Sequence, residues 1–370
     1  MKKVISIIIL LLILVNSMVL AEDMQSVVEK AVVLEAGDAE ESEDLYEGIR
    51  LQRVKLKITS GNHKGEIIDI ENHLSDNEAY NFFVKKGDKI LVVMEELQDG
   101  DYEVYIADYE RANYIIYLAI LFAILILIIG RTKGLKAIIS LALTIGSVFY
   151  ILLPQILKGV NPIPISVLIS IGVTIITIFL VSGVNTKSIA AIAGTSAGVI
   201  IAGLISYYVG LKIHLTGLSA DEATMLMYIP QEIEFNFKNL LFAGIILGSL
   251  GAVMDVGMSI ASAIEEVNNV NNNLSRKELF ISGMNVGKDV MGTMTNTLIL
   301  AYTGSSIPLL LLFMAYEAQL IEIMNSDIIA TEVVRSLAGS IGLVLTIPIT
   351  ALIASFLAKK QKLREDVKNE

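Results

Sequence analysis

The stretches LGSLGAVMDVGMSIASA, residues 247–263, and GMNVGKDVMGTMTNTLILAYTGSSIP, residues 283–308, decide the fold of this chain. Both are apolar enough for membrane helices, yet each carries an acid. Asp255 lies inside the first stretch, and Asp289 opens the apolar part of the second. An ionisable group at membrane depth is costly, so it usually faces a bundle interior or a water-filled cavity.

Helical spacing places small and polar residues on one face of each stretch, because residues three or four apart share a face. Small residues let helices approach closely in lipid, and hydroxyls and amides bond across such contacts. We therefore expect the two helices to pack together with their acids inward, lining a polar pathway or ligand site. The alternative is that the glycines only pack and Asp255 is a structural acid. The residues concerned are Gly244, Gly248, Gly251, Asp255, Ser259 and Ser262 in the first helix, and Asp289, Thr293, Asn296 and Thr297 in the second.

The end of the second stretch predicts a broken helix. Pro308 cannot donate to the carbonyl four residues earlier, and it disfavours helix at Ile307. If residues 290–315 form one span, the break falls near the bilayer midplane, where transporters use unwound backbone to hold ions or anionic substrates. A plain extracellular turn between two short helices is the alternative. The residues of this predicted site are Thr303, Gly304, Ser305 and Ser306.

Three long blocks of sequence carry a family resemblance. GAVMDVGMSIASA (251–263), the stretch 283–308 quoted above and RSLAGSIGLVLTIPITALIA (335–354) resemble the signature blocks of the YibE/F-like family of bacterial multipass membrane proteins. The resemblance covers the mature chain and is densest from Asn239 to Ala354. It implies a polytopic membrane protein, and a permease role is the usual guess for the family because of its architecture.

Composition agrees with a membrane protein and excludes several kinds of chemistry. Of the 370 residues 54% are hydrophobic, and the mean hydropathy is +0.65. The chain has no cysteine, so disulfides, thiolate metal sites and cysteine nucleophiles are excluded. It has no HExxH motif, and GMNVGK lacks the spacing of a phosphate loop. We expect no enzyme, no cofactor and no metal site.

The N-terminal third predicts an exported β-rich domain. Residues 1–21 have the charged start and short apolar core of a signal peptide, or form an N-terminal anchor. Residues 22–112 carry 23 acidic and 10 basic residues and alternate as about five short strands, which favours a small barrel resembling an OB-fold. Without a basic groove this domain does not suit nucleic acid, and neither His63 nor His73 has a metal-ligand pattern.

The remainder, residues 113–358, predicts a polytopic α-helical domain in the cell membrane, followed by a basic cytoplasmic tail at 359–370. When the chain crosses seven times with residues 22–112 outside, three basic clusters lie on the inner side, as the positive-inside rule expects. They are Arg131, Lys133 and Lys136, then Arg276, Lys277 and Lys288, and the tail KKQKLR. A turn at 303–306 would give eight spans and place the tail outside. Small residues predict a helix contact at Gly194 and Gly198. The expected spans are 114–130, 137–156, 163–182, 189–209, 239–262, 290–315 and 336–358.

Three functional classes follow from these observations. The first is a transporter, permease or channel for an unidentified small solute or ion. The second is a non-transporting scaffold or assembly factor that anchors the exported domain, with a second copy or another membrane protein as its partner. The third is an intramembrane hydrolase that uses Asp255 and Asp289 as a pair, and only the pair itself supports it.

Overall fold

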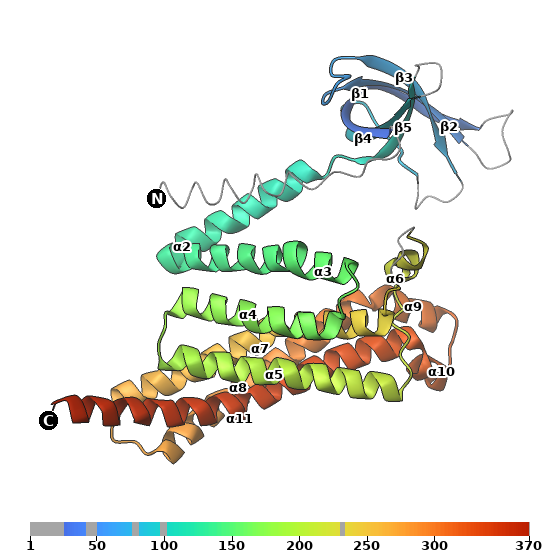
Figure 1. The fold of residues 1–370 in the computed structure, drawn as a ribbon. Helices are drawn as coiled ribbons and strands as arrows, with labels where there is room; N and C mark the ends of the chain where they lie inside the picture. Colours follow the sequence, from blue (N-terminus) through green and yellow to red (C-terminus); the bar gives the residue numbers. More distant parts are fainter. Residues whose placement is uncertain (1–25, 42–49, 76–80, 97–101, 230–233, 370) are drawn as a thin grey trace. The chain divides into compact units, whose positions relative to one another are not determined.

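The structure is a computed structural model that describes residues 26–41, 50–75, 81–96, 102–229 and 234–369. Two compact units divide at Phe122, and each is considered by itself (Figure 1). The predicted signal peptide or anchor at 1–21, and most of the acidic run that follows Gly37, lie outside the described residues.

The first unit is a five-stranded antiparallel sheet with the order β3-β2-β1-β4-β5. The five predicted strands are confirmed, although the first, at 16 residues, is not short. Its register shifts after Val33 and after Ala36, and such bulges bend a strand. The sheet therefore curls into a half-barrel around its apolar core (Figure 1). The strands are β1 (Ser26–Glu41), β2 (Arg50–Ile58), β3 (Ile67–Leu74), β4 (Lys89–Glu96) and β5 (Tyr102–Tyr109).

A buried amide network fixes the segment between β3 and β4 to the sheet. Gln52 Nε2 donates to the carbonyl oxygens of Gly37 at 3.0 Å and Val84 at 2.8 Å. Its Oε1 accepts from the Val84 amide and from Asn72 Nδ2, both at 3.2 Å. Asn72 Nδ2 also donates to the Phe82 carbonyl at 2.7 Å. Both of the side-chain polar atoms of Gln52 are thus paired, as burial requires.

The second unit is helical. The helices are α2 (Ala112–Ser147, which begins in the first unit), α3 (Leu153–Leu157), α4 (Pro162–Ser182), α5 (Thr186–Lys212), α6 (Asp221–Met225), α7 (Phe237–Val270), α8 (Arg276–Ser305), α9 (Ile307–Ala315), α10 (Leu320–Asn325) and α11 (Asp327–Asn369). Among the described residues, five helical stretches are long and apolar enough to cross a membrane, or six when α8 and α9 count as one bent span. The predicted tail at 359–369 continues α11 as helix.

Two of the predicted spans fall within one continuous stretch, Ala112–Leu157, which reverses direction. Arg131 has φ 46° and ψ −121°, outside the helical region. Gly134 lies directly against the carbonyl of Ile126. Residues eight apart in a straight helix are separated by about 12 Å, so this contact requires a turn between two helical arms. Figure 1 shows the reversal within α2.

Glycines allow α5 and α11 to pack closely. Gly194 lies against Thr350, and Gly198 lies against Thr346. A Cβ on Gly198 would also lie 2.8 Å from the Gly342 carbonyl oxygen, closer than real side chains approach. All four of the α5 positions Ala191, Gly194, Gly198 and Ala202 are buried. The two backbones therefore approach as a small-residue contact in lipid requires.

The first prediction concerns the amide network. Gln52→Leu should lower the free energy of unfolding of the β-domain by about 2–4 kcal/mol, because it leaves buried carbonyl and amide groups unpaired. Urea unfolding of residues 22–112, expressed as a fragment, measures the change. Arg53→Gln is the control, since the Arg53 side chain is 88% exposed. Equal stability of Gln52→Leu and the parent would contradict the network's role.

The second prediction concerns the α5–α11 contact. Gly198→Ala should destabilise the helical unit by about 1–3 kcal/mol, because the added methyl group overpacks the contact. The melting temperature of the purified chain in detergent reports the change. Gly172→Ala on α4 is the matched control, since no described atom lies within 4 Å of a Cβ placed on Gly172. Identical melting curves for the two variants would show that the contact tolerates expansion.

Candidate functional site

Most of the small and polar face of α7 is exposed, and of its glycines only Gly248 lies against another described helix, at the Tyr302 hydroxyl. Gly244, Gly248, Gly251, Asp255 and Ser259 are all exposed, and Ser262 is half-buried. No described atom lies within 4 Å of a Cβ placed on Gly244 or Gly251. The opposite face of α7 is apolar and buried. The predicted inward orientation of Asp255 is therefore wrong for the single chain.

Helix α8 begins earlier than its apolar pattern predicted. Ser275 and Glu278 form a capping box that starts the helix at Arg276. Asp289 consequently lies near the middle of α8 and does not open it. Gly283 and Gly287 pack against Ile264 and Ile347, while Asp289 is exposed on the other side. The expected inward orientation of Asp289 is also wrong.

The outward face of α8 carries a polar track, which consists of Asp289, Thr293, Asn296 and Thr303. The exposed apolar side chain of Leu300 interrupts this track between Asn296 and Thr303. The polar positions recur at helical spacing along the outward face, with Thr297 beside them. The Thr293 hydroxyl donates to the Val290 carbonyl, and the Thr297 hydroxyl donates to the Thr293 carbonyl. Because these hydroxyls are paired within the helix, the carboxylate of Asp289 and the amide of Asn296 are the groups that remain to face a solute, water or a partner.

The predicted break is present, but it is shorter than expected. Thr303, Gly304 and Ser305 are helical, and only Ser306 separates α8 from α9. The two helices are bent by 58°. The Tyr302 carbonyl, which has lost its helical partner at the bend, accepts from the hydroxyls of Ser305 at 2.7 Å and Ser306 at 3.1 Å. The prediction that residues 303–306 are unwound is therefore wrong.

The depth of the break in a bilayer stays a prediction. Thirty residues of α8 extend for about 45 Å, which exceeds the hydrocarbon core of about 30 Å. Helix α8 is nevertheless apolar enough for a span only together with α9. A span at 290–315 would therefore contain the bend at Ser306.

A cavity of about 260 Å³ lies between the break and α11. Its polar lining comes from Tyr302, Thr303 and Ser306 on one side and from Glu332 and Ser336 on the other. Glu332 Oε1 accepts from Arg335 at 2.6 Å. Glu332 Oε2 is buried and has no hydrogen-bond partner among the described residues. We refer to this space as the break cavity.

Tyr302 connects the break cavity with α7. A Cβ on Gly248 would lie 2.8 Å from the Tyr302 hydroxyl, so a larger residue at this position would displace that hydroxyl. The Arg335 guanidinium lies 5.9 Å from the centre of the same ring. The break cavity is therefore lined by one carboxylate and several hydroxyls, and the Arg335 guanidinium lies next to it against Glu332 and Tyr302. Such a set can bind a cation, a proton or a small polar solute.

Glu332 and Tyr302 were not among the residues predicted for the site. Both Glu332 and Arg335 precede the span predicted at 336–358. Helix α11 begins at Asp327, so both belong to a membrane-length helix. Glu332 and Arg335 are three residues apart next to an apolar segment. This spacing could have indicated the site, because paired charges in such segments seldom face lipid.

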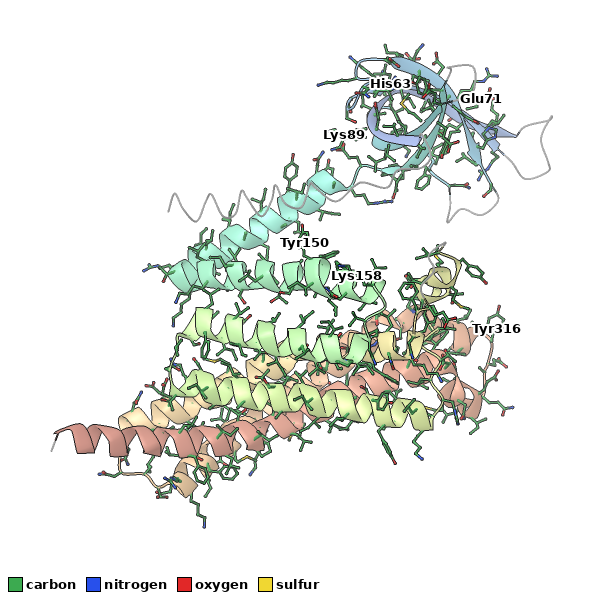
Figure 2. The ribbon with its side chains drawn as sticks, in the orientation of Figure 1. His63, Glu71, Lys89, Tyr150, Lys158 and Tyr316 are labelled. Atoms are coloured by element: carbon green, nitrogen blue, oxygen red, sulfur yellow. The ribbon has the colours of Figure 1, made fainter. Side chains whose placement is uncertain are left out.

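The β-domain has an open groove of about 600 Å³, and none of its lining residues was predicted for the site. The charged residues of this lining are Glu35, Arg53, Lys55, Asp69 and Glu71. His63 Nδ1 lies 3.3 Å from the Glu66 carboxylate, and its ring contacts Tyr102 edge to face (Figure 2). No group of three or more His, Cys, Asp or Glu side chains in the described ranges could hold a metal ion. Gly61, at the predicted turn, packs on Glu29, whose Oε1 accepts from the Asn62 amide at 2.9 Å.

Comparison with known proteins identifies the family. No curated protein and no solved structure matches the chain. The model of the YibE/F family N-terminal domain matches residues 25–109, which contain the half-barrel. The model of the YibE/F-like protein matches residues 118–360, which contain the membrane-length helices and the break cavity. Since these matches cover most of its length, the chain belongs to the YibE/F-like family.

Proposed function

We propose that this protein is a permease or channel for a small solute or ion, with a pathway along the polar track of α8 into the break cavity. The observation that carries the proposal is that Glu332, whose buried Oε2 has no partner among the described residues, lines the same cavity as Thr303 at the end of the track. Irregular backbone and charged groups in lipid persist where protein or a water-filled space surrounds them.

A scaffold function is the alternative, and a different observation favours it. The exposed glycines of α7 form a surface on which another membrane helix can pack closely. In that case Asp255 and Asp289 bond across a dry interface between proteins, and no solute passes. The two functions differ in whether water reaches the α8 track.

We also propose that the chain crosses the cell membrane seven times, with the β-domain outside. The turn at Arg131 divides Ala112–Leu157 into two arms, each of membrane length. With α4, α5, α7, the bent α8–α9 pair and α11, these arms make seven spans. Arg131, Lys133 and Lys136 then lie inside, as do Arg276 and Lys277, in agreement with the positive-inside rule.

The third prediction tests this topology. A reporter enzyme that is active only outside the cytoplasm should remain inactive when fused after Glu370. The same reporter should be active when fused after Glu110, which precedes the first span. Activity of the C-terminal fusion would require an even number of spans and would contradict the proposal.

The fourth prediction tests the pathway and uses the absence of native cysteine. Thr293→Cys and Asn296→Cys should react with a small, charged, membrane-impermeant methanethiosulfonate, because water fills the track. Leu204→Cys on α5 should not react, although Leu204 is 63% exposed, because it faces lipid. Mass spectrometry of labelled membranes measures the difference. Unreactive cysteines at 293 and 296 would favour the scaffold.

A flux screen in proteoliposomes complements the labelling. Entrapped pH- and cation-sensitive dyes, together with a panel of radiolabelled solutes, identify what the parent chain transports. Glu332→Gln should reduce that flux at least about tenfold, because it removes the only carboxylate among the described residues that line the cavity. Lys238→Gln, an exposed change at the start of α7, is the control. Undiminished flux in Glu332→Gln would move the pathway away from this cavity.

A further inference from the structure

A second polar cavity, of about 230 Å³, lies at the opposite end of the helical unit from the break cavity. Its walls are the start of α5, the last turns of α7 and the segment that follows α7. The Ala354 and Ala358 side chains of α11 complete the lining. Its volume is several times the roughly 30 Å³ that one water molecule occupies in the liquid. The polar side chains that line it are Thr186, Lys187, Glu265, Asn268, Asn269 and Asn272.

An ion pair closes this cavity between two helices. Lys187 Nζ on α5 lies 2.6 Å from Glu265 Oε2 on α7, and the two side chains are 25% and 33% exposed. Asn268, one turn after Glu265, has a buried Oδ1 that lacks a hydrogen-bond partner among the described residues. The cavity is thus lined by one positive charge, on Lys187, and one negative charge, on Glu265. Asn268 Oδ1 is a hydrogen-bond acceptor without a donor among the described residues.

The two walls of the cavity differ in electrostatic sign. The α5 wall has Lys187 in the first turn of a 27-residue helix, where the helix dipole is positive. The α7 wall has Glu265 and the Asn268 carbonyl in the last two turns of a 34-residue helix, where the dipole is negative. A simple anion would face Glu265, and a simple cation would face Lys187. A dipolar ligand satisfies both walls at once.

We propose that this cavity binds a small zwitterion of the amino-acid type. The ligand carboxylate pairs with Lys187, and the ligand ammonium donates to Glu265 and to Asn268 Oδ1. In the free protein, Lys187 and Glu265 pair with each other, so binding exchanges one ion pair for two. The site is separate from the break cavity, and the inference concerns binding alone, so it does not rest on the proposed transport.

Ligand chemistry provides the first test. Glycine, L-alanine and L-glutamine are added to the purified full chain in detergent, and thermal unfolding is followed. At least one of them should raise the melting temperature by about 2 °C or more at saturation. N-acetyl-L-alanine, which lacks the ammonium, and L-alaninamide, which lacks the carboxylate, should not. The proposal would be overturned if none of the three amino acids raised the melting temperature. It would also be overturned if N-acetyl-L-alanine or L-alaninamide raised the melting temperature as much as the amino acids do.

Variants provide the second test, with calorimetric titration of the best of the three amino acids. Lys187→Met and Glu265→Gln should each weaken binding at least about tenfold, because each removes one charge-assisted contact. The exchange Lys187→Glu with Glu265→Lys keeps an ion pair and the net charge, so it tests for loss of folding. This double variant should keep the fold and lose the ligand. The acid at position 187 would cancel the positive dipole end of α5, and the base at position 265 would cancel the negative dipole end of α7, so neither wall would keep its electrostatic sign.

The control is Lys238→Met at the other end of α7, which should bind as the parent does. Unchanged affinity in Lys187→Met would place the ligand elsewhere and overturn the proposal. Because the titration measures no flux, loss of binding in these variants and loss of transport in Glu332→Gln are separate results.

Discussion

The constraint on which the helical unit depends is that lipid offers no hydrogen bonds to polar groups. Packing between helices relies instead on small residues, as at Gly198 against α11. At the bend after α8, serine hydroxyls replace the amide that the Tyr302 carbonyl has lost. The same constraint makes the uncovered acids informative, because Asp255 and Asp289 need either water or another protein beside them.

The two cavities of the helical unit differ in the side chains that line them. The break cavity combines a bend, hydroxyls and a carboxylate with one free oxygen. The cavity at the start of α5 is balanced in charge, and its ion pair joins two helices. Helix α11 lines both, so a shift of α11 relative to α7 would change the two cavities together. The half-barrel, by contrast, is stabilised by its own apolar core and its buried amide network.

Sequence periodicity predicted the five strands and most of the membrane-length helices, because alternation and long apolar runs are local signals. It placed Asp255 on the right face of α7 but could not show that this face is uncovered, since coverage depends on the other helices. Hydropathy missed the first turns of α8, although the capping box at Ser275 and Glu278 was readable. Glu332 was missed because an acid near a span end resembles a loop residue.

The turn at Arg131 has a consequence for how the chain enters the membrane during synthesis. The two arms of α2 are joined within a few residues, and Gly134 already touches the Ile126 carbonyl. Because the connection is so short, one arm cannot remain in water while the other arm inserts into the membrane. In the proposed seven-span topology, the arms leave the insertion machinery as one helical hairpin, and the basic residues at the turn favour its inner orientation.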